Sequence, residues 1–175
     1  MRYPSDIYLH AARRPANAAA LAALAAAVAP LLPVAPTAHA DNRRLNESVF
    51  VNIFTAQHRN GCRTDTRLDP RLVEAAQRHT FDVRDHRNIN GSIGSDGSTT
   101  QDRALAAGFA GSVAETVAIN PALAISGVEI LNQWWHNPVS RAIMQDCSHD
   151  AVGVWSENSL DRTVVVAVYG SSAVQ

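Results

Sequence analysis

The sequence predicts an α+β domain in which helices flank a small antiparallel sheet. In the first half of the chain, apolar residues recur at intervals of three and four, the period of an α-helix. Near the carboxyl end, AVGVW and RTVVVAVYG are β-prone runs separated by the turn residues of SENSLD, a pattern typical of an antiparallel hairpin. Helices that precede and separate a few antiparallel strands indicate a layered α+β fold.

The first forty residues are predicted to precede this domain. Arg2, Arg13 and Arg14 lead into a long alanine-rich apolar run, which ends in small residues around Ala38 and Ala40. This order is typical of a cleaved secretory signal, so residues 1–40 are predicted to be a signal peptide and residues 41–175 a single domain. A retained membrane anchor is the alternative, but three prolines interrupt the apolar run.

The charge of the domain limits its partners. The whole chain has 175 residues and a net charge of −1. Without the three arginines and one aspartate of residues 1–40, 12 basic and 15 acidic residues remain, a net charge of −3. A negative domain argues against a nucleic-acid partner or an anionic membrane surface. We expect a monomer, secreted or associated with the cell envelope, with no membrane span once the signal is removed.

The two cysteines, Cys62 and Cys147, both lie in the exported part of the chain. In an oxidising compartment two such cysteines pair, and no Cys/His spacing offers a metal site instead. The predicted disulfide closes a loop of 85 residues, for which chain entropy gives an upper stabilisation of about 4.5 kcal/mol.

Two helices are predicted at the start of the domain. Asn46 or Ser48 caps the first, whose apolar residues are spaced by three and four and which ends at a glycine. Asp69 and Pro70 begin the second, because aspartate caps helices and proline suits the first helical position. His79 lies along one side of this second helix, and we expect it to have a structural role.

The middle of the chain is predicted to pass from loop to strand to helix. NINGSIGSDGS is rich in turn-forming residues and is predicted to be a loop, after which Ser98 or Thr99 caps a short helix over 101–107. AETVAI is expected to be extended. Pro121 is expected to begin a long, well-buried helix that reaches Trp134, and Pro138 to begin a further short one.

Residue patterns argue against three common kinds of site. Oxygen-bearing side chains recur in NINGSIGSDGSTTQD, but Gly97 stands where a calcium loop requires glutamate. Ser92 has Asn90 at the position where a nucleophile elbow requires its first glycine. The five histidines of the domain never occur at the i, i+4 spacing of a helical zinc site. The sequence therefore predicts no metal and no cofactor.

Five sequence blocks together resemble a known family. They are, in order, GCRTDTRLDPRLVEAAQRHTFDV, GSIGSDGSTTQDRALAAGF, AETVA, WWHNPVSRAIM and AVGVW. The series is similar to bacterial members of the CAP superfamily, the SCP-like extracellular domains, from about Asn46 to Gly170. Each block is short, but five in the family order are specific. The resemblance implies a CAP-type α-β-α layered sandwich.

The resemblance also implies a cleft in which many members hold a divalent metal between two histidines and one or two acids. The family's glutamate matches Glu115, but Ser92 and Ser140 stand at the two histidine positions. Asn137 is near the place of the second acid. A hydroxyl is a poor zinc ligand, and Asn137 and the following proline turn the chain between His136 and Ser140, so His136 is a poor substitute. These five residues are the predicted binding cleft, with a degenerate metal site.

The sequence thus predicts a secreted, non-enzymatic CAP-domain protein that binds a small apolar ligand or a cell-envelope partner. One alternative is a hydrolase or protease that uses Glu115 as general base and the hydroxyl of Ser92 or Ser140. A structural wall protein without a ligand is another. Because the neighbours of Glu115 are apolar, we expect its carboxylate to be part-buried, with Ser92 and Ser140 as hydrogen-bond donors.

Overall fold

The computed structural model describes residues 39–63, 65–121 and 125–172. The predicted signal peptide lies outside these residues, apart from His39 and Ala40. All described residues belong to one unit, Ala35–Gln175. Within the described part of the chain, no helix has the length and apolar composition needed to cross a membrane.

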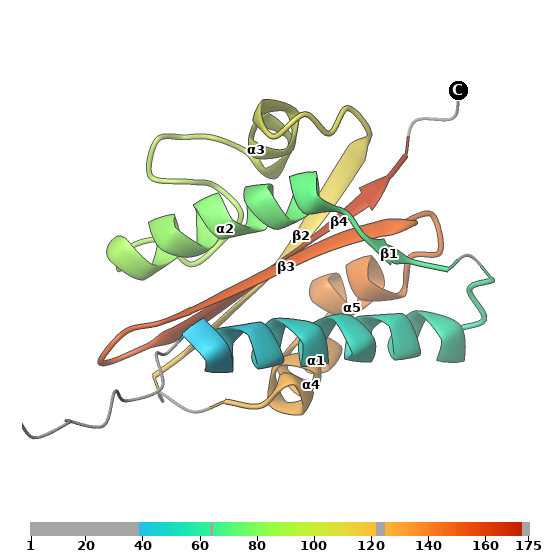
Figure 1. Ribbon diagram of the computed structural model, residues 1–175, viewed down its shortest axis with the longest axis horizontal. Helices are drawn as coiled ribbons and strands as arrows, with labels where there is room; N and C mark the ends of the chain where they lie inside the picture. The colour runs from blue at the N-terminus through green and yellow to red at the C-terminus, as the bar shows by residue number, and fades with distance from the viewer. Residues whose placement is uncertain (1–38, 64, 122–124, 173–175) are drawn as a thin grey trace, which may run out of the picture. The chain divides into compact units, whose positions relative to one another are not determined.

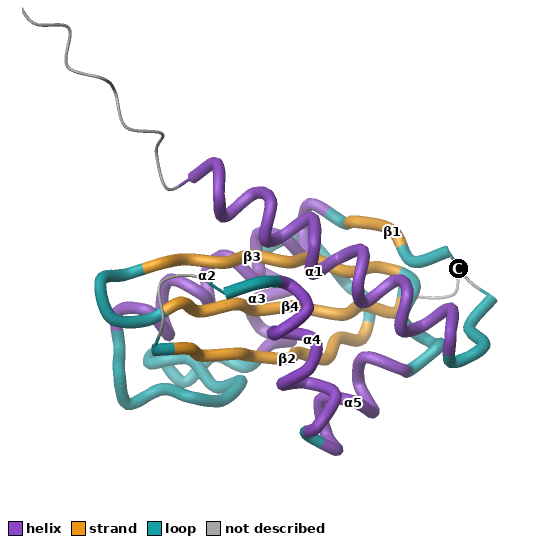
Figure 2. The backbone as a smooth tube through the Cα atoms, turned by 90° about the horizontal axis from the view of Figure 1, so that it is seen from below, coloured by secondary structure: helices purple, strands orange, loops and turns teal. Residues whose placement is uncertain are grey.

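Four strands form one mixed sheet in the order β1-β3-β4-β2. The predicted hairpin is confirmed as β3 (Ala151–Asn158) and β4 (Thr163–Ser171), which pair antiparallel. β4 also pairs antiparallel with β2 (Ser112–Asn120), the predicted extended segment, as Figure 2 shows. β1 (Arg67–Leu68) adds a parallel edge to β3. The sheet is therefore mixed, whereas the sequence predicted an antiparallel sheet. The prediction missed β1 because a strand of two residues is too short to show a periodic pattern.

The helices form two layers, one on each face of the sheet (Figure 1). α2 (Pro70–Asp85) and α3 (Thr100–Ala106) cover one face. α1 (His39–Arg59), α4 (Gly127–His136) and α5 (Pro138–Gln145) cover the other. The predicted α-β-α sandwich is confirmed.

β4 is the central strand of both hydrophobic cores. Val164, Val166 and Val168 pack toward α2 and α3. Val165, Ala167 and Tyr169 pack toward α1, α4 and α5. Because side chains alternate between the faces of a strand, a strand covered on both faces must be apolar throughout, which explains the uninterrupted run TVVVAVY.

Gly153 allows α2 to lie directly against β3. A Cβ atom built on this glycine would lie 2.0 Å from the main-chain carbonyl carbon of Leu72 and 2.1 Å from the amide nitrogen of Val73. Real atoms cannot approach so closely, so no larger residue fits here without a shift of helix or strand. The glycine of AVGVW therefore sets the distance between these two layers.

Most predicted helix boundaries are confirmed. The Asp69 side chain accepts a hydrogen bond from the backbone of Arg71 at the start of α2. Thr99 caps α3 in a reciprocal capping box with Asp102. α5 begins at Pro138, as expected.

Two helix starts differ from the prediction. α1 begins at His39, several residues before Asn46. The helix expected from Pro121 does not begin there, because β2 continues through Asn120 and α4 begins only at Gly127. The true start is marked by Ser126, which forms a capping box with Glu129. α4 is also less buried than expected, since Val128 is 66% exposed.

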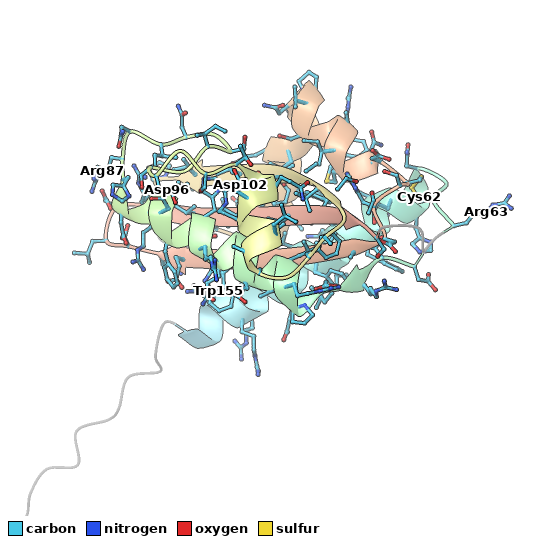
Figure 3. All side chains as sticks on the ribbon, turned by 90° about the horizontal axis from the view of Figure 1, so that it is seen from above. Cys62, Arg63, Arg87, Asp96, Asp102 and Trp155 are labelled. Atoms are coloured by element: carbon cyan, nitrogen blue, oxygen red, sulfur yellow. A yellow bond between two sulfur atoms is a disulfide. The ribbon has the colours of Figure 1, made fainter. Side chains whose placement is uncertain are left out.

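Cys62 and Cys147 form the predicted disulfide, with their Cα atoms 5.1 Å apart (Figure 3). Cys62 follows α1, and Cys147 lies between α5 and β3. The bond joins the end of the first helix to the segment that enters the hairpin, across 85 residues of sequence.

Candidate functional site

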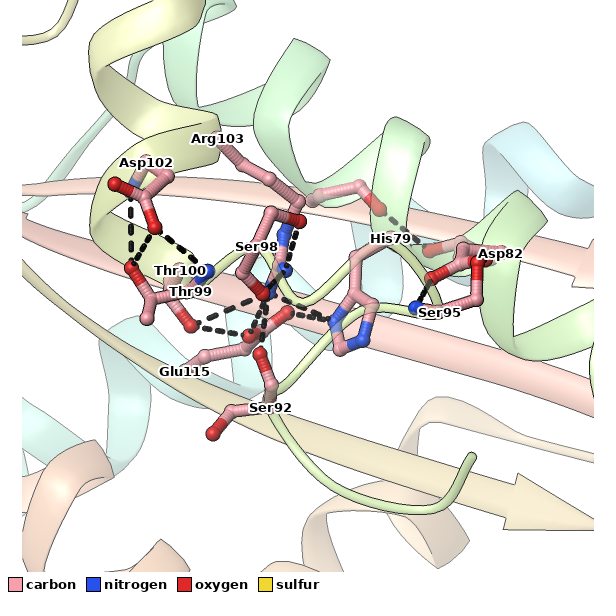
Figure 4. A network of polar contacts seen from close by, with 12 residues as sticks. His79, Asp82, Ser92, Ser95, Ser98, Thr99, Thr100, Asp102, Arg103 and Glu115 are labelled. Carbon is pink, nitrogen blue, oxygen red and sulfur yellow. Dashed lines mark hydrogen bonds and ion pairs between the residues drawn. The ribbon is translucent and has the colours of Figure 1, made fainter. Parts of the chain in front are cut away.

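Glu115 lies in β2 with its side chain only 1% exposed, at the centre of the polar network in Figure 4. Its Oε1 accepts a hydrogen bond from His79 Nδ1 at 2.6 Å. Its Oε2 accepts one from Arg103 Nη2 at 2.8 Å and another from the hydroxyl of Thr100. Both carboxylate oxygens are therefore occupied by donors from α2 and α3, and the predicted burial of this residue is confirmed.

Arg103 joins this carboxylate to the loop between α2 and α3. Its Nη2 also donates to the backbone oxygen of Ser92 at 2.8 Å. Its Nη1 donates to the backbone oxygen of Ser98 at 2.9 Å. The guanidinium is 7% exposed, and its charge balances that of Glu115, as a buried ion pair requires.

His79 lies on the buried side of α2, and its side chain is fully buried. A carboxylate can only accept hydrogen bonds, so the short contact with Glu115 places the imidazole proton on Nδ1. Nε2 has no partner among the described residues. The structural role predicted for His79 is thus tied to Glu115, a partner that the sequence did not indicate.

Asp82 of α2 also holds the loop between α2 and α3, at Ser95. Ser95 donates to Asp82 from its backbone nitrogen at 2.7 Å and from its hydroxyl at 2.5 Å. Partial burial acts to raise the pKa of Asp82, but the Ser95 hydrogen bonds and nearby His86 and His79 lower it overall. The carboxylate is thereby kept charged, and it fixes the second half of the loop against α2.

The two predicted hydroxyl donors do not reach Glu115. Ser92 is exposed, and only its backbone oxygen contacts the network, through Arg103. Ser140 lies on α5, which packs on the other face of the sheet. The carboxylate takes its hydrogen bonds from His79, Thr100 and Arg103 instead, so the donors expected from the sequence are wrong.

The remaining predicted cleft residues also lie away from Glu115. His136 is exposed at the end of α4, and its Nδ1 contacts the Asn132 oxygen at 2.8 Å. Asn137 caps α5 by accepting from the backbone nitrogens of Val139 and Ser140. The structure therefore groups His136, Asn137 and Ser140 at the α4–α5 junction, apart from Ser92 and Glu115.

The residues around Glu115 do not fit a bound divalent cation. A metal at this carboxylate would meet the guanidinium of Arg103, which already supplies the balancing positive charge and repels a second cation. Among the described residues, no three His, Cys, Asp or Glu side chains are grouped so as to hold a metal.

The second candidate site is an open groove of about 410 Å³ between α1 and α4. Each helix contributes four residues at positions i, i+3, i+4 and i+7, a stripe that faces the other helix. The lining is Asn52, Thr55, Ala56 and Arg59 from α1, and Val128, Leu131, Asn132 and Trp135 from α4. Apolar atoms dominate its surface, and polar side chains come mainly from α1.

The arrangement of two helical layers around one sheet is shared with solved structures, among them a protein that contains an SCP domain, of the CAP fold. The chain superimposes on an outer surface protein from Borrelia burgdorferi with a TM-score of 0.64 and 15% identity, over 72% of this chain and 91% of that one. An extracellular protein containing an SCP domain from Bacillus anthracis gives a TM-score of 0.64 at 15% identity, over 75% of this chain and 41% of that one.

A cysteine-rich secretory protein from Staphylococcus aureus gives a TM-score of 0.54 at 11% identity, over 75% of this chain and 39% of that one. The chain therefore spans about two fifths of the Bacillus and Staphylococcus structures. At these identities the likeness shows the fold alone. No family model matches the sequence, and no curated protein matches it.

Two residues of the Glu115 network, Thr100 and Arg103, were not predicted. On α3 the buried residues are Thr100, Arg103 and Ala104, at i, i+3 and i+4. An arginine on the buried side of a short helix requires a buried acid, and Glu115 is the single acid in β2. That combination is visible in the sequence and could have indicated the pair.

Proposed function

We propose that the protein is an exported, non-enzymatic binding protein of the CAP fold, which takes a small apolar molecule with an acidic group into the groove between α1 and α4. The groove is the observation that carries the proposal. Its volume of about 410 Å³ lies within the range of small-molecule sites. Val128, Leu131 and Trp135 supply apolar surface on one wall.

The polar residues of the groove indicate the acidic group. Arg59 is exposed and forms no ion pair with any described residue, so its charge is available to a ligand. A carboxylate or sulfonate on the ligand supplies an acceptor for this guanidinium.

The geometry of Glu115 supports a non-enzymatic role. A general base needs a free lone pair within hydrogen-bond reach of its substrate. Glu115 is 1% exposed, and both its oxygens already accept hydrogen bonds from fixed side chains. The hydroxyls of Ser92 and Ser140 do not contact it, so neither serine of the hydrolase alternative lies beside this base.

Export is supported by the signal-like first forty residues and by the disulfide, since structural disulfides belong to oxidising compartments. The Borrelia and Bacillus structures are described as an outer surface protein and an extracellular protein.

Fluorescence titration with 1-anilinonaphthalene-8-sulfonate, an apolar ring system with one anionic group, tests the groove. We expect the probe to bind the folded protein saturably. Val128→Asp should weaken this binding about tenfold or more, because the bound probe would remove water from the new carboxylate. Val139→Asp is the matched control, since Val139 is 69% exposed on α5, outside the groove. Equal binding by both variants would place the probe elsewhere.

The acidic group is tested with Arg59→Gln, which should weaken binding of the same probe. Arg141→Gln, an exposed arginine on α5, should leave it unchanged. A panel of ester and peptide substrates tests the alternative function. Hydrolysis that Glu115→Gln abolishes in a protein that still folds would contradict the non-enzymatic role.

A further inference from the structure

The chain contains two Asn-Gly pairs, Asn60-Gly61 and Asn90-Gly91, in different surroundings. This dipeptide undergoes spontaneous deamidation. The glycine backbone nitrogen attacks the asparagine side-chain carbonyl carbon, a carbon–nitrogen bond forms, and the side-chain nitrogen leaves as ammonia. Water then opens the resulting succinimide at either carbonyl, which yields aspartate or isoaspartate. The reaction needs a mobile asparagine side chain and an uncommitted glycine nitrogen, and glycine presents no side chain to hinder the attack.

At Asn60, both the asparagine side chain and the following glycine nitrogen are restrained by hydrogen bonds. Its Nδ2 donates to the Gln145 backbone oxygen at 3.0 Å, and its Oδ1 accepts from Gln145 Nε2 at 3.3 Å. The Gly61 nitrogen donates to the His58 oxygen at 3.0 Å, at the end of α1. Gly61 also has a φ of +90°, a conformation fixed by this helix end. Both the attacking and the attacked group are therefore restrained.

Asn90 has none of these restraints. Both Asn90 and Gly91 are exposed, and neither the Asn90 side chain nor the Gly91 nitrogen forms a hydrogen bond with a described residue. A Cβ atom built on Gly91 would meet nothing within 4 Å, so the main chain here is not packed. On either side of this pair the loop is held, by the buried side chain of Ile89 and by the Ser92 backbone oxygen, which accepts from Arg103.

We propose that Asn90 is a site of spontaneous deamidation in this protein and that Asn60 is protected. The reaction consumes water, releases ammonia and needs no enzyme or cofactor. It adds one negative charge to the loop, and the isoaspartate product also lengthens the main chain by one methylene group. Two residues later, the Ser92 backbone oxygen accepts from Arg103 at 2.8 Å. The isoaspartate product therefore disturbs a contact to the Glu115 network, whereas the aspartate product adds only charge.

Peptide mapping by mass spectrometry of the folded full-length protein, incubated at mildly alkaline pH, measures both sites in the same molecules. We expect Asn90 to convert at least about tenfold faster than Asn60, the ratio given by a barrier difference of about 1.4 kcal/mol. In unfolded protein the two should convert at similar rates, because each is then an unrestrained Asn-Gly. Equal rates in the folded protein, or an unchanged Asn90, would overturn the proposal.

Two variants extend the test. Gly91→Ala should slow conversion at Asn90 severalfold or more without unfolding the protein, because Gly91 has open space around it and no positive φ. Asn90→Asp reproduces the charge without the lengthened main chain. We expect this variant to melt like the fresh parent, and isoaspartate-rich parent to melt lower. Conversion in Gly91→Ala at the parental rate would show that the glycine nitrogen is not the attacking group.

Discussion

The two helical layers of the sandwich pack against the same sheet in different ways. On one face, α2 contacts β3 at Gly153 without intervening side chains, and a charged cluster is sealed beneath α2 and α3. On the other face, an apolar core around Trp134 fills the space beside the sheet, but α1 and α4 leave a groove between them. The difference shows that close packing accompanies the fixed polar network, while the apolar layer leaves an open groove.

The largest effect is expected from Glu115→Ala, which breaks the sealed cluster. It leaves the guanidinium of Arg103 buried without a balancing negative charge and the Nδ1 of His79 without its acceptor, so the free energy of unfolding should fall by about 3–5 kcal/mol. Glu115→Gln keeps one acceptor and should lose about 1–3 kcal/mol. Urea unfolding at neutral pH measures both. Glu74→Ala, which removes an exposed pair with Arg78, is the control and should change stability by under about 1 kcal/mol.

Gly153→Ala should come next, with a loss of about 3 kcal/mol, because its Cβ would overlap the backbone of Leu72 and force α2 away from β3. Thermal unfolding by circular dichroism measures it. Gly91→Ala, in open space, should leave the melting temperature almost unchanged. Equal melting of the two variants would mean that the layers are less closely packed than described.

A smaller effect is expected in the other layer from Trp134→Phe. Trp134 is 2% exposed, but its Nε1 has no hydrogen-bond acceptor among the described residues, so phenylalanine loses volume and no hydrogen bond. We expect a loss of about 1 kcal/mol by urea unfolding. Trp135→Phe at the groove, where the ring is 39% exposed, should cost less still. A loss above about 3 kcal/mol for Trp134→Phe would indicate a buried partner for the indole nitrogen.

The smallest effect concerns pH. Burial lowers the pKa of His149, and Asp146 and Asp150 oppose this only in part. In the unfolded chain histidine binds a proton near pH 6.5, while the folded protein resists protonation. The contribution of neutral His149 to the free energy of unfolding is therefore complete above about pH 6.5. It decreases as the pH falls toward the lowered pKa of His149 in the folded protein.

Urea midpoints compared at about pH 7.5 and pH 5.5 measure this slope. His149→Gln should flatten the slope, and His136→Gln, at an exposed histidine, should leave it unchanged. A parental slope in His149→Gln would assign the pH dependence to other groups.

Local sequence signals predicted much of the fold. Proline at Pro70 and Pro138 marked two helix starts because the residue suits only the first turn, and the hairpin followed from β-branched runs around turn residues. The same rule failed at Pro121, where a strand ends instead. The reciprocal capping pair of Ser126 and Glu129 was the better signal, because it satisfies two backbone donors rather than none.

The candidate site was predicted less well, because it depends on contacts between distant residues. The burial of Glu115 followed from its apolar neighbours, but its partners lie 36 and 12 residues away in sequence, on different helices. The grouping with Ser140 failed because α5 lies across the sheet. The groove was not predicted because its two stripes become a site only when α1 and α4 are placed side by side.

The position of β4 has a consequence for how the protein is made. This strand follows every other described element in sequence, yet it pairs on both sides and supplies side chains to both cores. Neither core is complete before residues 163–171 have been synthesised, so earlier segments emerge with their apolar faces uncovered. We therefore expect the two cores to close only after this last strand has left the ribosome, late in the synthesis of the domain.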